Sequence, residues 1–187
     1  GEIVTRRFIV NVRNPQLAPP PANAPGGSAV RLKPRELGAL NWDDRLTIEV
    51  LGHAPGLRTV SIAPVDVPTL FLLGDSTVTD QRHEPYAGWG QMLPQYFKPD
   101  VAVSNHAESG LALFSFEGGK RLKKIQSMMQ PGDYLFIQFG HNDQKDKELA
   151  PDSGYRDYLI RYVEEAQKAG IKPVLVTPVA RRTFDPE

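Results

Sequence analysis

The sequence predicts an α/β protein with a doubly wound parallel sheet, preceded by a small β-rich module. Three observations support this prediction. Apolar runs without polar alternation recur after Pro68, helix-like patterns lie between them, and short β-branched segments fill the chain before Pro68. Apolar runs of this kind are typical of strands buried on both faces of a sheet, and repeated strand-helix units favour parallel pairing.

The β-rich module is expected to span residues 1–67. Its candidate strands are short, rich in β-branched residues and separated by turn-forming residues. They cover residues 3–13, 29–33, 46–52 and 57–64. Residues 15–29 are too rich in Pro and Gly for a helix or strand, so we interpret them as a surface loop, with a domain linker as the alternative. Because the β pattern resumes after this loop, we place the domain boundary at "PVDVP", residues 64–68.

The α/β domain is expected to span residues 68–187. Its four predicted strands cover residues 69–74, 101–107, 133–140 and 172–178. Two segments between them, 118–129 and 155–170, carry apolar residues at helical spacing, and the second ends at a glycine. In a sheet of this type, an active site lies in the loops outside the carboxyl ends of the strands.

Composition excludes several classes of function. The 187 residues, 40% of them hydrophobic, suffice to bury a core, and the formal net charge of zero gives no sign of a nucleic-acid partner. No run is long enough to span a membrane, and no signal-peptide pattern is present. The absence of cysteine excludes disulfides and thiol catalysis, but it leaves the cellular compartment open.

Polar residues gather at the ends of three predicted strands. Asp75 and Ser76 follow the first strand, Ser109 and Gly110 follow the second, and residues 141–143 (His-Asn-Asp) follow the third. Because the carboxyl ends of parallel strands meet at one edge of a sheet, a hydroxyl, a glycine N–H and a carboxamide come close together there. These are the parts of a serine nucleophile with an oxyanion hole.

Each of these residues has a predicted role. Ser76 would attack, while its own N–H, the N–H of Gly110 and the side-chain amide of Asn142 would bind the negative oxygen of the tetrahedral intermediate. The alternative for Ser76 is a helix N-cap, which the other strand-end residues disfavour. Asp75 is expected to bond local backbone N–H groups and to hold the turn. Trp89 would stack on a sugar ring or be buried.

The histidines and acidic residues indicate neither a metal nor a cofactor. His141, Asp143 and Asp146 lack a fourth ligand, so we expect no metal there. His141 and His106 are interpreted as residues of a pocket wall or of the packing, with His141 and Asp143 in supporting positions. His53 is expected in a surface turn.

Three blocks resemble a known family. "GDSTVTD", "NHAESG" and "FGHND" resemble the first three signature blocks of the GDSL or SGNH hydrolases, most closely those of the rhamnogalacturonan acetylesterase-like branch. "YAGWGQML" (86–93) and "PVARRTF" (178–184) are further matches to that branch, so the resemblance covers about residues 69 to 184.

The resemblance implies a flavodoxin-like three-layer fold without a metal. It implies a serine esterase that removes acetyl groups from pectic polysaccharide, and hence an extracellular or periplasmic protein. By position, Ser76 is the nucleophile and Gly110 and Asn142 are the oxyanion donors. The region upstream of the sheet resembles the β-sandwich modules that precede the esterase domain in some bacterial members.

The sequence departs from the family at one point. The fourth block, an Asp-x-x-His, supplies the general base and its orienting acid, and the chain stops at Glu187 before it, with four of about five expected strands. The resemblance therefore implies a piece of a longer protein, or one that needs a partner chain, and an isolated chain with little or no activity. Asp80 and His83 have the spacing of the Asp-x-x-His block, but they lie too close to Ser76 along the chain to supply its base. We expect them to form a solvated pair in a loop.

Two other functions remain as alternatives. A non-catalytic carbohydrate-binding protein would keep the esterase scaffold without a base. A lipase or thioesterase of the same superfamily would share the nucleophile and the oxyanion donors.

Overall fold

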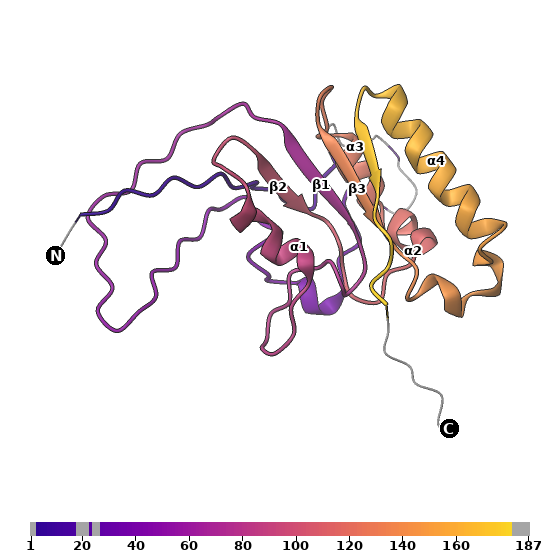
Figure 1. The fold of residues 1–187 in the computed structure, drawn as a ribbon, viewed down its shortest axis with the longest axis horizontal. Helices are drawn as coiled ribbons and strands as arrows, with labels where there is room; N and C mark the ends of the chain where they lie inside the picture. The colour runs from indigo at the N-terminus through magenta and orange to yellow at the C-terminus, as the bar shows by residue number, and fades with distance from the viewer. Residues whose placement is uncertain (1–2, 18–22, 24–26, 181–187) are drawn as a thin grey trace.

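A four-stranded parallel sheet forms the centre of the protein (Figure 1). The computed structural model describes residues 3–17, 23 and 27–180. The strand order is β2-β1-β3-β4, and all three neighbouring pairs are parallel. The strands are β1 (Thr69–Gly74), β2 (Ala102–Asn105), β3 (Tyr134–Gln138) and β4 (Lys172–Leu175). The predicted doubly wound α/β sheet is confirmed.

Helices cover both faces of this sheet and complete three layers. The α-helices are α1 (Trp89–Met92), α2 (Leu113–Gly118), α3 (Arg121–Gln126) and α4 (Gly154–Lys168). The 3-10 helices are η1 (Pro34–Glu36), η2 (Leu93–Tyr96), η3 (Asp143–Lys145) and η4 (Lys147–Leu149). Residues from α2, α3 and α4 pack on one face and residues from α1 and η2 on the other. In the part of the chain that is described, no helix has the length and apolar character needed to cross a membrane.

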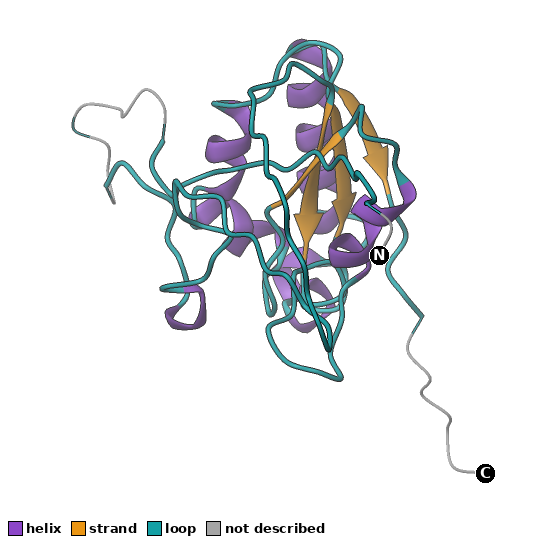
Figure 2. Cartoon of the chain, turned by 90° about the vertical axis from the view of Figure 1, so that its left-hand side faces the viewer, coloured by secondary structure: helices purple, strands orange, loops and turns teal. Residues whose placement is uncertain are grey.

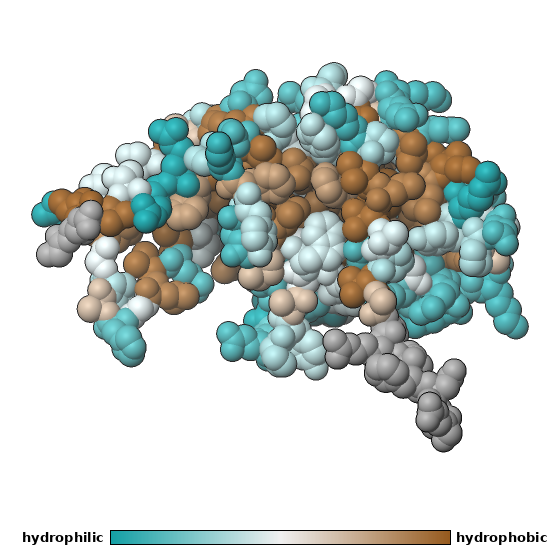
Figure 3. Space-filling model, in the orientation of Figure 1, coloured by the Kyte–Doolittle hydropathy of each residue, from teal (hydrophilic) through white to brown (hydrophobic). Residues whose placement is uncertain are grey.

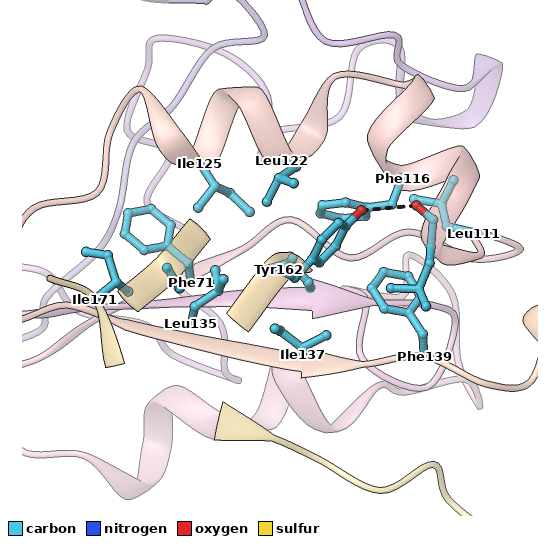
Figure 4. Packing of buried hydrophobic residues seen from close by; sticks show 13 residues of the cluster. Phe71, Leu111, Phe116, Leu122, Ile125, Leu135, Ile137, Phe139, Tyr162 and Ile171 are labelled. Atoms are coloured by element: carbon cyan, nitrogen blue, oxygen red, sulfur yellow. Dashed lines mark hydrogen bonds between the residues drawn. The ribbon is translucent and has the colours of Figure 1, made fainter. Parts of the chain in front are cut away.

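Side chains of β1 alternate between two hydrophobic clusters, as the pleat of a strand requires. Phe71 and Leu73 belong to the cluster under α2, α3 and α4, whereas Leu70 and Leu72 belong to the cluster under α1. Figure 4 shows the larger cluster, in which Tyr162 of α4 lies fully buried and donates a hydrogen bond from its hydroxyl to the Leu113 carbonyl at 3.1 Å. The apolar runs seen in the sequence are therefore buried on both faces.

The predicted helix over residues 118–129 is interrupted. α2 ends at Gly118 and α3 begins at Arg121. Between them Lys120 adopts a left-handed backbone with φ of 62°, which cannot continue a right-handed helix. The apolar stripe of residues 122 and 125 still packs on the sheet, so the helical spacing was informative although the start of the helix was wrong.

The predicted strands of the upstream region do not form. Over residues 3–17 and 27–68 the described chain has loop, turns and η1, with one isolated antiparallel bridge between Gln16 and Ala29 (Figure 2). Phe8 is 78% exposed and Ile62 is 70% exposed, and Figure 3 shows hydrophobic residues on these loops at the left of the view. β-branched residues pack well on the surface of a sheet, but a strand forms only where a neighbouring backbone accepts and donates its hydrogen bonds. These segments lack that neighbour. The domain boundary near residue 68 stays a prediction.

Part of the upstream region packs directly on the α/β domain. The Arg31 N–H donates to the Gly119 carbonyl at 2.9 Å, and the Lys124 ammonium donates to the Gln16 carbonyl at 2.6 Å. Glu36 of η1 forms an ion pair with Arg121 of α3, and both side chains are buried. This contact holds η1 against α3, and a hydrogen bond from the Arg82 guanidinium to the Arg35 carbonyl at 2.7 Å joins η1 to the loop after β1.

Candidate active site

Ser76 lies in a tight turn directly after β1. The buried carboxylate of Asp75 accepts from the Thr77 N–H at 2.9 Å and from the Thr77 hydroxyl at 2.8 Å. The Asp75 carbonyl accepts from the N–H groups of residues 78 and 79, both at 3.1 Å. No helix starts at this turn, since the next one begins at Trp89, and Ser76 therefore caps no helix. A Cβ on Gly74 would overlap the Val78 side chain, so the turn requires a glycine at that position.

The loop after β2 lies beside this turn. The Glu108 N–H donates to the Gly74 carbonyl at 3.2 Å. The side-chain amide of Gln81 donates to the Ser76 carbonyl at 2.9 Å and to the Ser109 hydroxyl at 3.4 Å, and it so bridges the two blocks. Gly110 follows with φ of 75°, in the left-handed region that favours glycine.

The loop after β3 contacts the same region. The Asn142 side-chain amide donates to the Leu111 carbonyl at 2.9 Å, and the Lys145 ammonium donates to the Asn142 side-chain oxygen at 3.0 Å. The Asp143 carboxylate accepts from the N–H groups of Leu113 and Gly140, both at 2.8 Å. Burial raises the pKa of Asp143, against the lowering effect of these two donors. Asp143 therefore ties β3 to the start of α2.

Three hydrogen-bond donors remain available at this edge of the sheet. Within the described part of the chain, no backbone acceptor takes the N–H of Ser76 or of Gly110. The Asn142 amide keeps a second N–H beyond the one that it donates to Leu111. Gly110 is exposed, and Ser76 and Asn142 are half-buried, so a substrate can approach all three. The use of these three groups as oxyanion donors stays a prediction.

The Asp80 and His83 pair is not formed. The Asp80 carboxylate accepts from the Asn105 side-chain amide at 2.8 Å. Burial raises the pKa of Asp80, although the bond from Asn105 and the charge of Arg13 lower it. The His83 side chain is exposed, in the loop that precedes α1. Asp80 is therefore oriented toward β2 and does not orient an imidazole.

The other histidines have separate environments. His106 is fully buried, lies edge-on against the Trp42 ring at 5.4 Å between centroids, and has its pKa lowered by burial first and by neighbouring cations second. The His141 Nε2 lies 2.7 Å from the Val179 carbonyl oxygen. His53 is exposed in the upstream region. Among the described residues, no histidine hydrogen-bonds the hydroxyl of Ser76.

Trp89 is half-buried at the start of α1. Its indole N–H donates to the Gln138 side-chain oxygen at 2.7 Å, and its ring packs against the cluster that contains Leu72. Gln138 in turn donates to the Thr77 hydroxyl, which links β3 to the Ser76 turn. Sequence reasoning missed Gln138, although its position at the end of β3 was a usable signal. Gln81 and Lys145 gave no comparable signal.

Known proteins are similar to more than half of this chain. It is 48% identical over 118 residues to the rhamnogalacturonan acetylesterase RhgT of Bacillus subtilis strain 168, covering 62% of this chain and 51% of that protein. It is 37% identical over 121 residues to the "probable rhamnogalacturonan acetylesterase YesY" of the same strain, covering 62% and 56%. These identities accompany three signature blocks in order at the ends of parallel strands. The identities and the three blocks support a GDSL, or SGNH, hydrolase.

A solved structure supports the α/β fold. The crystal structure of the Bacillus subtilis protein YxiM matches with a TM-score of 0.55 and 31% identity, over 65% of this chain and 35% of that one. No family model matches the chain. The chain spans about half the length of these two curated relatives, 51% of one and 56% of the other.

Proposed function

We propose that this protein is a serine esterase that removes O-acetyl groups from a plant cell-wall polysaccharide of the pectic, rhamnogalacturonan-like type, outside the cell or in the periplasm. One observation carries the reaction class: the loops that hold Ser76, Gly110 and Asn142 are joined at one edge of the sheet, with donors available for a negative oxygen. The substrate class rests on the relatives named rhamnogalacturonan acetylesterase.

The reaction proceeds through an acyl-enzyme. The Ser76 oxygen attacks the acetyl carbonyl carbon, its proton moves to a general base, and the carbonyl oxygen becomes negative. The N–H groups of Ser76 and Gly110 and the amide of Asn142 bind that oxygen. Collapse breaks the bond to the sugar oxygen, which takes the proton from the base. Water then adds to the acetyl-serine, acetate leaves, and Ser76 is restored.

We infer that the general base is a histidine supplied from outside these 187 residues. Each histidine of the chain is placed elsewhere: His106 is buried, His141 contacts a backbone carbonyl, His83 is exposed without its expected acid, and His53 is exposed upstream. A base must reach hydrogen-bonding distance of the nucleophile and be held there by a partner. The Asp-x-x-His block of the family is the expected source.

Acetate release tests the proposal. Protein expressed from the full coding sequence is assayed with acetylated rhamnogalacturonan, acetylated xylan and p-nitrophenyl esters of increasing chain length, with Ser76→Ala as the control. We expect the fastest release from the pectic substrate and none with the variant. A preference for long-chain esters would favour a lipase, and saccharide binding without acetate release would favour a binding protein. Either result contradicts the proposal.

A further inference from the structure

Two cations from the upstream region bind one backbone oxygen of the candidate oxyanion loop. The Lys33 ammonium donates to the Ser109 carbonyl at 2.6 Å, and the Arg35 guanidinium donates to the same oxygen. Lys33 precedes η1 and Arg35 lies within it, whereas Ser109 lies in the loop after β2. The contact thus joins a segment upstream of the sheet to the loop that carries Gly110.

The Ser109 carbonyl and the Gly110 N–H belong to the same peptide unit. In a planar trans peptide these two groups point in opposite directions, so a contact that fixes the oxygen also fixes the direction of the N–H. Gly110 has φ of 75°, and a glycine gives the backbone little steric preference of its own. An external contact is therefore needed to hold this peptide plane in one orientation.

The same contact strengthens Gly110 as a donor. A cation at a peptide oxygen withdraws electron density from the C–N unit and makes its N–H more acidic. Hydrogen bonds with a charged partner are also shorter and stronger than neutral ones. The two cations thus polarise the Gly110 N–H toward a negative oxygen on its other side.

Buried contacts hold η1 in place. The Glu36 carboxylate forms the buried ion pair with Arg121, and it accepts from the Trp42 indole N–H at 3.0 Å and from the Lys33 N–H at 2.8 Å. Arg35 also forms an ion pair with Glu108, whose carboxylate accepts the Ser109 N–H at 2.6 Å. These contacts hold η1 in one place, so the Lys33 and Arg35 side chains start from a fixed backbone.

We propose that Lys33 and Arg35 are positioning residues of the oxyanion site, which hold and polarise the Ser109–Gly110 peptide so that its N–H binds the negative oxygen. The inference rests on the proposed function, because it takes the Gly110 N–H as an oxyanion donor. It adds to the esterase site a contribution from outside the three signature blocks. Both residues contact the Ser109 carbonyl, so each acts through the peptide.

The orientation of the peptide is measured by nuclear magnetic resonance without any substrate. In ¹⁵N-labelled protein, the Gly110 amide is compared between wild type, Lys33→Met, Arg35→Met and the double variant. Loss of a cation from the Ser109 oxygen is expected to move the Gly110 nitrogen resonance upfield, most in the double variant. Lys33→Arg should restore it in part, and Lys123→Met, which changes an exposed lysine of α3, should leave it unchanged. An unchanged Gly110 resonance in the double variant overturns the proposal.

Kinetics then separate positioning from folding. In protein expressed from the full coding sequence, Lys33→Met should lower kcat about tenfold and leave KM unchanged. This loss is smaller than the loss of about 10²- to 10³-fold that follows removal of a whole oxyanion donor. Lys33→Arg should recover most of the turnover and should restore the Gly110 resonance to a similar degree. A purely structural defect would not make turnover and the resonance recover together. Unchanged kcat overturns the proposal even if the resonance moves. If wild type releases no acetate, the proposed function fails, and the Gly110 resonance alone decides whether the two cations hold the peptide.

Discussion

Replacing Glu36 by Gln removes the carboxylate that pairs with the buried Arg121. The side chains of Arg121 and Glu36 are only 1% and 4% exposed. Arg13 lies near the same cluster, with its guanidinium carbon 4.6 Å from the centroid of the Trp42 ring, and burial lowers its pKa to about 10. The variant leaves a buried cation without its counter-charge, and the amide nitrogen of Gln cannot accept the hydrogen bonds that the lost oxygen accepted.

The expected loss of stability is large. Breaking a buried pair by removing one partner costs about 3 to 5 kcal/mol. For a domain of this size that corresponds to a fall in Tm of about 6 to 20 °C. Urea denaturation followed by circular dichroism measures the free energy of unfolding. The double variant Glu36→Gln with Arg121→Met should recover part of the loss, because the uncompensated charge is then gone.

A matched control comes from a partly exposed ion pair between α2 and α4. Glu117 pairs with Arg161 at 2.6 Å, with the side chains 35% and 41% exposed. Glu117→Gln should therefore cost only about 0.2 to 1 kcal/mol, as exposed pairs do. If Glu36→Gln costs no more than this control, the ion pair does not anchor η1 and the reasoning is wrong.

Three further predictions concern turnover, packing and pH. Asn142→Ala should lower acetylesterase turnover by about 10²- to 10³-fold, the scale of one lost oxyanion donor, and unchanged steady-state kinetics would remove Asn142 from that role. Phe116→Ala should cost about 3 to 5 kcal/mol in urea denaturation, because Phe116 is fully buried, while Phe114→Ala on the same helix, at a 46% exposed position, should cost far less. Burial raises the pKa of Asp80 above its ordinary value of 3.8. The free energy of unfolding of wild type relative to Asp80→Asn should therefore be greatest below pH 3.8 and fall as the pH rises through the raised pKa. A relative free energy of unfolding that rises over this pH range would contradict the raised pKa.

The sheet could be predicted from the sequence because its signals are local. The run over residues 69–74 was predicted with the bounds of β1, since it is apolar throughout and ends at a Gly-Asp pair that forms the turn. The long helix was predicted over 155–170 and spans Gly154–Lys168. The start of α3 was missed because the left-handed backbone of Lys120 follows from the packing of two short helices and is not visible in helical spacing.

The upstream region was mispredicted because strand formation depends on a partner. Its residues have β propensity, yet the described backbone has no ladder there. The contact between the three strand-end loops and the turn that holds Ser76 could be predicted from the strand ends, whereas the roles of the site residues stay predictions. The contact of Lys33 with Ser109 could not be predicted, because it joins residues 76 positions apart through the packing of η1.

Chemical labelling of Ser76 tests the central claim most directly. Protein expressed from the full coding sequence is treated with a fluorophosphonate, and the modified residue is located by peptide mass spectrometry, with Ser76→Ala as the control. The account predicts one adduct on Ser76 and none in the variant, because an activated serine beside oxyanion donors attacks the phosphorus. An adduct on another residue, labelling that persists in Ser76→Ala, or no labelling of wild type would contradict it.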